Sequence, residues 1–340
     1  MSGEIGISVV IPCFADERLG DVLHCLAALS RQTTQAAETV VVVDHNPALL
    51  ERLSAAAPVA RTVANRGPRG SSGARNAGIA STRGEIVAFF DDDAAPEPDC
   101  LERLAAHYAD ERVAGVGGGV DPDWRTGRPR WFPEEFDWVV GCSYRGLPTH
   151  PAALRNLLGA NMSFRRDALA AAGGFSARMA RRGATPLGVD DTELCIRLRR
   201  RLPGKVLVYA PEARARHHVP AARATWSYFW RRCLAEGRAK AALTAVSGVG
   251  ESLSSERSYA LRVLPVGMAR GVRAAATGGD RAGILRSLAI LAGLLVTSAG
   301  YIFGRLDGAR TGSPSLLPEH AARPPASPSS TRIEPPEGGR

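Results

Sequence analysis

The sequence has 340 residues and is 45% apolar, which is enough for an ordinary globular core in one large domain or two smaller ones. Its formal net charge is +9, because 43 Lys and Arg outnumber 34 Asp and Glu, and this charge suits anionic surfaces such as phosphates, membranes or nucleic acid. Six scattered cysteines without a Cys-x-x-Cys pair argue against a disulfide framework or a zinc site, and they indicate free thiols in a reducing compartment.

The first third of the chain alternates two kinds of segment. Short β-branched, apolar runs predict strands over 5–11, 38–43, 59–63, 84–90 and 113–120. Apolar residues at helical spacing predict helices over 19–29, 47–57, 74–81 and 99–108, with a glycine-rich loop over 66–73. This alternation indicates βαβ units, so we predict an α/β fold with a mostly parallel, Rossmann-like central sheet and flanking helices.

Three consecutive acids follow one of the most apolar of these strands. The segment 84–90 ends at Asp91, Asp92 and Asp93. Three adjacent carboxylates repel one another and are costly to bury without partners, whereas a divalent cation between them would offset that cost. Ligands of open α/β sheets bind outside the carboxyl ends of the strands. The pattern therefore predicts a metal–diphosphate site, with a solvated acidic turn as the alternative.

The second half of the chain is less regular. The segment 124–145 is rich in Trp, Pro, Arg and Gly, and we expect it to face the surface. Strands are predicted over 157–164 and 205–209, and helices over 166–172, 191–202 and 225–243.

The C-terminal part has a different composition. The segment 287–304 has no charged residue, is bracketed by Arg286 and Arg305, and is at the lower limit of length for crossing a bilayer. The basic, partly apolar segment 257–273 can lie on an anionic membrane surface. We therefore predict membrane association, with a buried packing helix as the alternative. From about residue 312 the chain is rich in Pro, Ser and Arg, which predicts a disordered tail.

Seven motifs occur in a fixed order along residues 5–220. They are VVIPCF at 9–14, VVD at 42–44, GARNAG at 73–78, DDD at 91–93, GANMSFR at 159–165, GGF at 173–175 and DDTELCIRL at 190–198. The ordered set resembles the family 2 glycosyltransferases, which have a GT-A fold. The resemblance implies a glycosyltransferase domain over 1–245, with a nucleotide-sugar-binding half (1–120) and an acceptor and catalytic half (121–245). A helical membrane-associating region (246–311) and the tail (312–340) complete the chain.

The resemblance implies an inverting, metal-dependent transfer of a single sugar, of the hexosyltransferase type, from a nucleotide-diphosphate sugar. A UDP-sugar is the favoured donor, Mn²⁺ or Mg²⁺ the cofactor, and a saccharide or polyprenyl-linked lipid the acceptor. The expected place is the cytoplasmic face of the cell membrane, in cell-envelope or polysaccharide biosynthesis. The chain lacks the Gln-x-x-Arg-Trp motif of processive relatives, which favours single-sugar transfer.

The resemblance also assigns residues to the donor and to the metal. Arg75 pairs with the diphosphate or with the acidic triplet, since it opens a helix whose N-terminus favours anions. Asp93 is the direct metal ligand, Asp91 and Asp92 lie toward the ribose or the metal, and His217 is a third metal or phosphate contact, with a structural loop histidine as the alternative. The expected nucleotide-sugar contacts are Pro12, Phe14, Glu17, Asp44, Arg75, Asn76, Asp91 and Asp92.

Catalysis needs a carboxylate that deprotonates the acceptor hydroxyl. The resemblance makes Asp191 the general base and Asp190 its supporting acid, whereas an ordinary helix cap is the alternative interpretation of an acid at this position. One base opposite the leaving group predicts inversion. The aromatic, Arg-rich segment 124–138 is interpreted as part of the acceptor site, with core packing as the alternative for each ring. The expected acceptor contacts are Trp131, Trp138 and Asn161.

Two other classes of function fit parts of the sequence. A nucleotidyltransferase acting on sugar phosphates also combines aspartates, Mg²⁺ and a nucleotide, but it needs a Gly-rich, basic loop after the first strand, where this chain has Pro12-Cys13-Phe14. A nucleic-acid-binding protein would explain the positive charge. The acids at the strand ends and the lack of a recognition motif argue against it.

Overall fold

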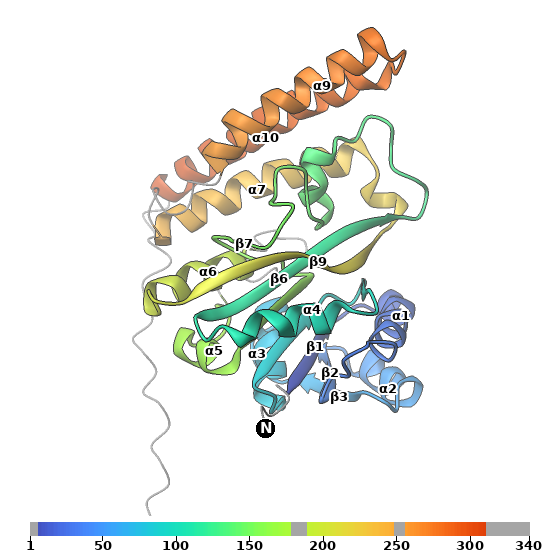
Figure 1. Cartoon of the computed structure of the whole chain (residues 1–340), viewed down its shortest axis with the longest axis vertical. Helices are drawn as coiled ribbons and strands as arrows, with labels where there is room; N and C mark the ends of the chain where they lie inside the picture. Colours follow the sequence, from blue (N-terminus) through green and yellow to red (C-terminus); the bar gives the residue numbers. More distant parts are fainter. Residues whose placement is uncertain (1–5, 178–188, 248–255, 311–340) are drawn as a thin grey trace, which may run out of the picture.

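The computed structural model describes residues 6–177, 189–247 and 256–310 (Figure 1). Nine strands in these ranges form one sheet, in the order β3–β2–β1–β4–β8–β6–β9–β5, and β7 pairs with β9. The strands are β1 (Ile7–Cys13), β2 (Glu38–Asp44), β3 (Arg61–Asn65), β4 (Ile86–Phe90), β5 (Ala94–Pro96), β6 (Val113–Trp124), β7 (Ala152–Ala153), β8 (Asn161–Arg165) and β9 (Val206–Val219).

Helices cover both faces of the sheet and one end of the molecule. The α-helices are α1 (Leu19–Leu29), α2 (Pro47–Ala56), α3 (Ser71–Ser81), α4 (Cys100–Ala106), α5 (Arg166–Ala172), α6 (Asp190–Arg201), α7 (Trp226–Ser247), α9 (Leu264–Thr277) and α10 (Ala282–Arg310). The 3₁₀ segments are η1 (Asp16–Arg18), η2 (His107–Ala109), η3 (Glu134–Val140) and η4 (Ala221–Arg223), and η5 (Tyr259–Val263) is a π-helical turn.

The pleat of the strands explains the two helical layers. Alternate side chains of a strand point to opposite faces, so Val9 and Ile11 pack with α1, α2 and α4, whereas Val10 packs with α3, α5 and α6. Strands that are buried on both faces need continuous apolar sequence, which is what the β-branched runs provide.

Parallel pairing is confined to two parts of the sheet. β3, β2, β1 and β4 are parallel, as predicted, and β6 is parallel to β9. β8 pairs antiparallel with β4 and β6, and β5 and β7 pair antiparallel with β9, so the second half of the sheet is mixed. The carboxyl ends of β1, β2 and β4 meet at one edge, and Asp44 and Asp91 lie there.

Strand β9 is longer than the predicted 205–209. After a register shift at Gly118 and Gly119 of β6, its second part pairs with the end of β6 and with β5. This pairing sets His217 opposite Ala94, beside the acids that end β4. His217 is 3% exposed and lies in a strand rather than in the loop that the alternative interpretation assumed.

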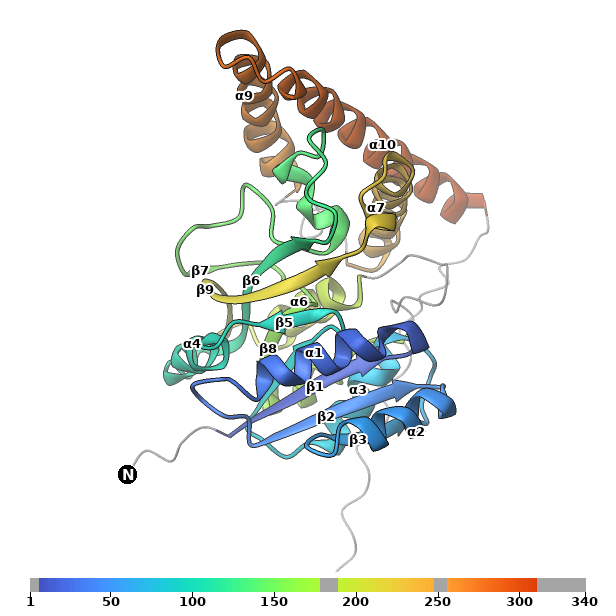
Figure 2. The same cartoon turned by 90° about the vertical axis from the view of Figure 1, so that its right-hand side faces the viewer.

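A third apolar cluster corrects the expectation that 124–145 faces the surface. Phe132, Phe136 and Val140 are fully buried, and they pack with Phe229 of α7 and Ile290 of α10. The aromatic residues of this segment therefore join the sheet to the C-terminal helices, which lie beyond the end of β6 and β9 (Figure 2).

The predicted apolar segment 287–304 is the centre of α10. α10 packs against α7 and pairs with α9 to form the outer layer of the molecule (Figure 1). Residues 282–308 make it the one helix of the described ranges that is long and apolar enough to cross a membrane. The division of the chain into domains stays a prediction, and the tail over 312–340 lies outside the described residues. All six cysteines are buried and free, as predicted.

Candidate active site

The acids after β4 lie at the floor of the site. Asp93 is paired on both carboxylate oxygens: His217 Nε2 lies 3.0 Å from Oδ1, while Arg18 and Arg223 face Oδ2, with Arg223 at 3.5 Å. Burial alone would raise the pKa of Asp93, but His217 and Arg18 outweigh burial and hold that pKa well below its usual range. Asp93 is therefore ionised at neutral pH.

Asp92 behaves in the opposite way. Burial, and then the charge of Asp93, raise its pKa to about 8, although Arg18 opposes this shift. The trio therefore holds fewer than three negative charges at neutral pH. A cation bound among these carboxylates would offset their mutual repulsion, and it would therefore favour the ionised form of Asp92.

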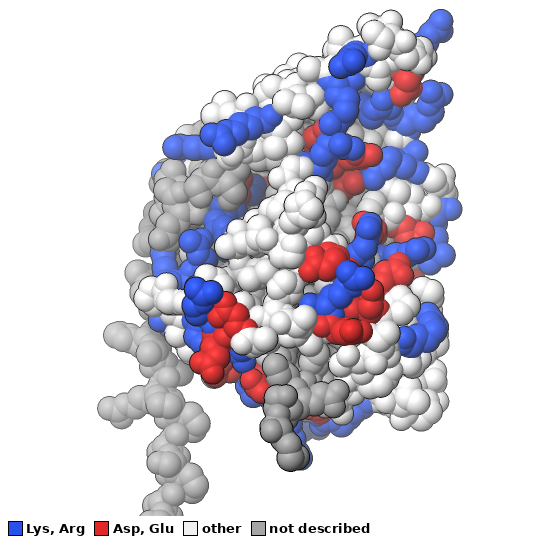
Figure 3. Space-filling view, in the orientation of Figure 1, with Lys and Arg blue, Asp and Glu red and all other residues white. Residues whose placement is uncertain are grey.

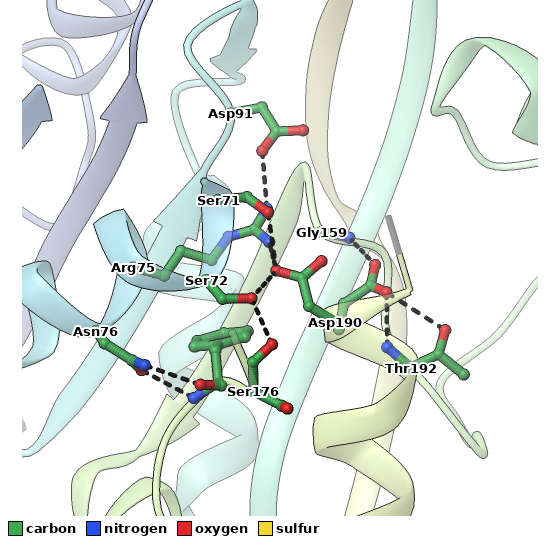
Figure 4. A network of polar contacts seen from close by, with 11 residues as sticks. Ser71, Ser72, Arg75, Asn76, Asp91, Gly159, Ser176, Asp190 and Thr192 are labelled. Atoms are coloured by element: carbon green, nitrogen blue, oxygen red, sulfur yellow. Dashed lines mark hydrogen bonds and ion pairs between the residues drawn. The ribbon is translucent and has the colours of Figure 1, made fainter. Parts of the chain in front are cut away.

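Arg75 connects the trio to the start of α6 (Figure 4). Its Nη2 donates to Asp91 Oδ1 at 3.1 Å, and its Nη1 donates to Asp190 Oδ2 at 3.0 Å. Ser71 and Ser72 donate to the same oxygen of Asp190 at 3.1 and 3.0 Å. One guanidinium thus contacts an acid from each cluster, so the two acidic groups lie on the same site although about 100 residues separate them in the chain.

Asp191 is held more loosely than its neighbour. Its Oδ2 accepts from the Gly159 N–H at 3.1 Å, and its Oδ1 accepts from the Thr192 N–H at 2.6 Å. Burial first, and then the charge of Asp190, raise the pKa of Asp191 to about 7, while Arg75 lowers it. A carboxylate with a pKa near neutrality and no ion pair to a described residue is suited to accept and release a proton.

Asp44 ends β2, and its carboxylate has three polar contacts. Asn65 donates to Oδ1 at 2.6 Å, the Gly70 N–H donates to Oδ2 at 2.8 Å, and His45 Nδ1 lies 2.9 Å from Oδ1. These contacts tie the ends of β2 and β3 to the start of α3. They set the rim of the site on the side of the first three strands.

One cavity of about 1360 Å³ joins all of these groups. The predicted site residues that line it are Pro12, Phe14, Asp44, Arg75, Asp91, Asp92, Asp93, Trp138, Asp190, Asp191 and His217. Its size exceeds what a small-molecule ligand of ordinary size needs, which leaves room for two substrates.

The comparisons with known proteins agree with this geometry. The model of the family described as glycosyl transferase family 2 matches residues 8–173. A protein named glucosyl-dolichyl phosphate glucuronosyltransferase, from Haloferax volcanii, is 29% identical over 304 residues, which cover 88% of this chain and 96% of that protein. Over residues 8–173 the chain resembles glycosyltransferase family 2.

Two further proteins are similar to this glycosyltransferase, one in sequence and one in solved structure. The succinoglycan biosynthesis protein ExoM of Rhizobium meliloti is 25% identical over 250 residues, covering 72% of this chain and 77% of that protein. The solved structure of mannosyltransferase PcManGT from Pyrobaculum calidifontis, in complex with GDP-Man and Mn²⁺, has a TM-score of 0.55 at 18% identity and covers 86% of each chain. The latter supports the GT-A fold, and the relatives together establish sugar transfer as the class of reaction.

Four predicted contacts do not reach the cavity of this glycosyltransferase. Asn161 is fully buried in the sheet and donates to the carbonyls of Gly119 and Ala213, so its assignment to the acceptor site is wrong. Trp131 does not line the cavity, because it stacks on Trp226 with ring centroids 3.9 Å apart.

The other two lie on the donor side. Asn76 exchanges two hydrogen bonds with the backbone of Phe175, which makes it a structural residue behind the site. Glu17 is exposed and is absent from the cavity lining. Each lies close in sequence to a residue that lines the cavity, Arg75 for Asn76 and Phe14 for Glu17. A sequence motif cannot tell which of its residues face the cavity and which face away from it.

The sequence reasoning missed Arg18 and Arg223. Both neutralise Asp93, one from η1 and the other after β9. Arg18 lies in the same loop as the predicted Glu17, so the motif pointed to the loop but not to this residue. No sequence pattern predicted a role for Arg223, because η4 reaches the acids after β4 only through the extension of β9.

Proposed function

We propose that this glycosyltransferase transfers one sugar, with inversion, from a nucleotide-diphosphate sugar to a lipid-linked acceptor, and that it needs a divalent cation and works at a membrane surface. The observation that supports the proposal most is the bridge made by Arg75. It joins Asp91 to Asp190, and these two acids line the same cavity as Asp93 and Asp191, a cavity large enough for two substrates.

Asp91, Asp93 and His217 are the residues that would hold the cation. Their ligand atoms lie within 4.8 Å of one another. The donor set combines two carboxylates with an imidazole, which suits Mn²⁺ or Mg²⁺ with imidazole favouring the former. His217 Nε2 faces Asp93, and its Nδ1 is buried without a hydrogen-bond partner in the described part of the chain, so one ring nitrogen is left unused there. When bound, the cation would neutralise the charge that develops on the leaving diphosphate.

Asp191 is the proposed base. In the transfer, Asp191 takes the proton of an acceptor hydroxyl, the hydroxyl oxygen bonds to the anomeric carbon, and the bond from that carbon to the diphosphate breaks. Asp190 does not share this task, because Arg75 and two serines occupy one of its oxygens. It positions Arg75 instead. A single displacement opposite the leaving group inverts the anomeric configuration.

The C-terminal helices support work at a membrane. One side of α10 packs on protein along its length: a Cβ on Gly293 would meet Phe136 at 2.3 Å, and one on Gly300 would meet the Leu234 carbonyl at 2.3 Å. The other side exposes apolar residues, which are Ile284, Leu285, Leu288, Leu291, Leu295, Ile302, Phe303 and Leu306. A helix with one apolar face free fits a position in the plane of the membrane better than a crossing of it.

The charge around this face fits an anionic lipid surface. Exposed arginines flank the apolar residues at Arg262, Arg273, Arg281 and Arg305. Figure 3 shows Lys and Arg beside uncharged surface over the part of the molecule where α9 and α10 lie. Cytoplasmic anionic lipids attract such basic residues, which supports the cytoplasmic face as the place of work.

A donor screen tests the proposal. The full chain is incubated with UDP- and GDP-sugars and with Mn²⁺ or Mg²⁺, and the released nucleotide is measured. We expect a nucleoside diphosphate as the product, loss of release in EDTA, and a product whose anomeric configuration, read by NMR, is opposite to that of the donor. Release of pyrophosphate would instead identify a nucleotidyltransferase, and a retained anomeric configuration would exclude Asp191 as a simple base.

A further inference from the structure

The cavity extends beyond the donor and catalytic residues to the C-terminal helices. One face of α7 contributes Tyr228, Arg232, Glu236 and Lys240 at intervals of four residues, which is the spacing of a single helical face. Facing them, α10 contributes Leu294, Thr297, Ser298, Tyr301 and Ile302. We call this part of the cavity, between α7 and α10, the helical arm. The wall from α7 is charged. The wall from α10 is uncharged, and we call it the apolar wall for Leu294, Tyr301 and Ile302, although Thr297 and Ser298 also belong to it.

The charged wall has an excess of cations. Arg155 donates two hydrogen bonds to Glu256, both at 2.7 Å, and Lys240 lies 2.7 Å from Glu256 and 3.2 Å from Glu236. Arg232 lies only 3.8 Å from Glu236. Among the described residues, three cations of this wall therefore face two carboxylates. Burial would raise the pKa of Glu256, but Lys240 and Arg155 outweigh burial and set that pKa at about 2, so its pairs are ionic at neutral pH.

Arg232 is the cation of this wall whose hydrogen-bond donors are not all paired within the described ranges. Its Nη1 is buried and has no hydrogen-bond partner within the described ranges. A buried guanidinium N–H without an acceptor costs free energy, and an anion that reaches it would remove that cost. A phosphate oxygen is the natural acceptor, because a guanidinium binds it in a planar, bidentate manner.

The apolar wall leads out of the molecule. Ile302 lines the cavity and is also 56% exposed, so it belongs both to the helical arm and to the apolar outer face of α10. Leu294 and Tyr301 continue the wall inward. An apolar chain lying in a membrane under α10 can thus enter the cavity along this wall without crossing a charged surface.

The helical arm is also within electrostatic reach of the proposed base. After burial and Asp190, the Glu236 carboxylate is among the groups that raise the pKa of Asp191. One cavity contains the Asp191 carboxylate together with Arg232 and Glu236.

We propose that the helical arm binds the acceptor as a glycosylated lipid phosphate, with its phosphate on Arg232 and Lys240 and its lipid chain along the wall of α10 to Ile302. The sugar of the acceptor then lies between the phosphate and Asp191, so that one of its hydroxyls meets the base. This inference rests on the proposed function and deepens it, because it assigns the acceptor class to named residues. The excess of cations in the charged wall would neutralise the negative charge of the bound phosphate.

Binding of farnesyl phosphate to the full chain in detergent, measured by calorimetry, tests the inference. Farnesol and inorganic phosphate serve as the chain-only and the phosphate-only probes, and we expect both to bind more weakly than farnesyl phosphate. Arg232→Gln should weaken farnesyl phosphate binding by roughly ten- to a hundredfold, which is the loss of a charge-assisted hydrogen bond. The matched control is Arg231→Gln on the exposed side of the same helix, which should bind as the unaltered chain does.

A second pair of variants tests the apolar wall and avoids altering a buried residue. Ile302→Asp should weaken farnesyl phosphate binding and leave inorganic phosphate binding unchanged. Leu306→Asp, which is equally exposed on α10 but absent from the cavity lining, should change neither. The inference is overturned if farnesyl phosphate binds no more tightly than inorganic phosphate, or if Arg232→Gln and Ile302→Asp both bind it normally.

Binding of UDP and GDP with Mn²⁺ to the same preparation keeps this test separate from the proposed function. Normal nucleotide binding without a preference for farnesyl phosphate would contradict the acceptor site alone. A chain that binds neither nucleotide and releases none from any nucleotide sugar would contradict the proposed function, whatever the lipid result.

Discussion

Asp190 and Asp191 are neighbours in the chain, yet their surroundings give them different tasks. Asp190 accepts hydrogen bonds from Arg75, Ser71 and Ser72, whereas the described donors to Asp191 are two backbone N–H groups and the adjacent Thr192 hydroxyl. The pKa of Asp191 is raised to about 7 by burial and by Asp190. A sequence motif of two acids cannot distinguish them, because the difference comes from Arg75 and the serines at the start of α3.

The pH dependence of turnover follows from this pKa. Only the ionised carboxylate of Asp191 accepts a proton, and a raised pKa means that it is protonated below about pH 7. We expect kcat/KM to rise about tenfold per pH unit below that value and to level off above it. The measurement is nucleotide release at saturating Mn²⁺ between about pH 5.5 and 8.5. A profile that is flat across this range would show that Asp191 is not the titrating base.

His217 and His218 are adjacent but face different partners. His217 Nε2 lies 3.0 Å from Asp93, whereas His218 Nδ1 lies 2.7 Å from Asp21. We expect His217→Ala to weaken Mn²⁺ binding at least about tenfold, since it removes one of three ligands, and His218→Ala to leave it nearly unchanged. Titration of Mn²⁺ by electron paramagnetic resonance, in the presence of UDP, measures both. Equal affinities of the two variants would remove His217 from the metal site.

At the scale of elements, the periodicity of the sequence predicted most helices well and failed where tertiary contacts decide. The bounds of α1 and α5 agree with the prediction, because the apolar spacing of both helices and the left-handed Gly173 that ends α5 are local properties. The predicted strand ends at Tyr209, ten residues before β9 does, because Pro211 and the arginines after it interrupt the apolar run. Ala213 and Ala215 nevertheless continue the alternation of a strand. Its extension depends on the partners β5 and β6, which no local pattern reveals.

The segment 124–145 shows the same limit. Its prolines and arginines gave it a polar appearance, but Phe132 and Phe136 are buried under α7 and α10. Composition could not predict this, because the helices that cover these rings come about 100 residues later in the chain for α7 and about 150 residues later for α10. For the same reason Trp131, which was predicted to bind the acceptor, stacks on Trp226 of α7.

The contact between α7 and α10 depends on small residues. A Cβ on Gly300 would lie 2.3 Å from the Leu234 carbonyl, so Gly300→Ala must separate the helices and should destabilise the chain by about 1–3 kcal/mol. A Cβ on Gly308 of the same helix meets nothing within 4 Å, and Gly308→Ala should be neutral or stabilising by up to about 1 kcal/mol. Thermal unfolding in detergent compares the two. An unchanged melting temperature for Gly300→Ala would contradict the close packing of α10.

At the scale of the whole molecule, the sheet, α7 and the C-terminal pair form successive layers, with the cavity between the first and the last (Figures 1 and 2). One cavity is thus lined by the acids of the donor site and by Ile302 of the exposed apolar face of α10. This arrangement suits an enzyme that takes a soluble donor from one side and a lipid-linked acceptor from the other.

An in-plane position of α10 predicts how the chain leaves a membrane. We expect binding to vesicles that contain anionic lipid, weakening as salt is raised, and release by alkaline carbonate, because only one side of α10 meets lipid. Leu288→Asp and Leu295→Asp, on the exposed face, should reduce vesicle binding without reducing nucleotide binding. Co-sedimentation with vesicles measures each effect. Resistance to carbonate would indicate a helix that crosses the bilayer.

The most direct test of the account compares Asp93→Asn and Asp191→Asn in one assay of UDP·Mn²⁺ binding and sugar transfer. If the acids after β4 hold the donor and the acid at the start of α6 removes the proton, Asp191→Asn abolishes transfer and binds UDP·Mn²⁺ nearly normally, while Asp93→Asn loses both. Substantial transfer by Asp191→Asn, or normal UDP·Mn²⁺ binding by Asp93→Asn, would contradict this division of roles.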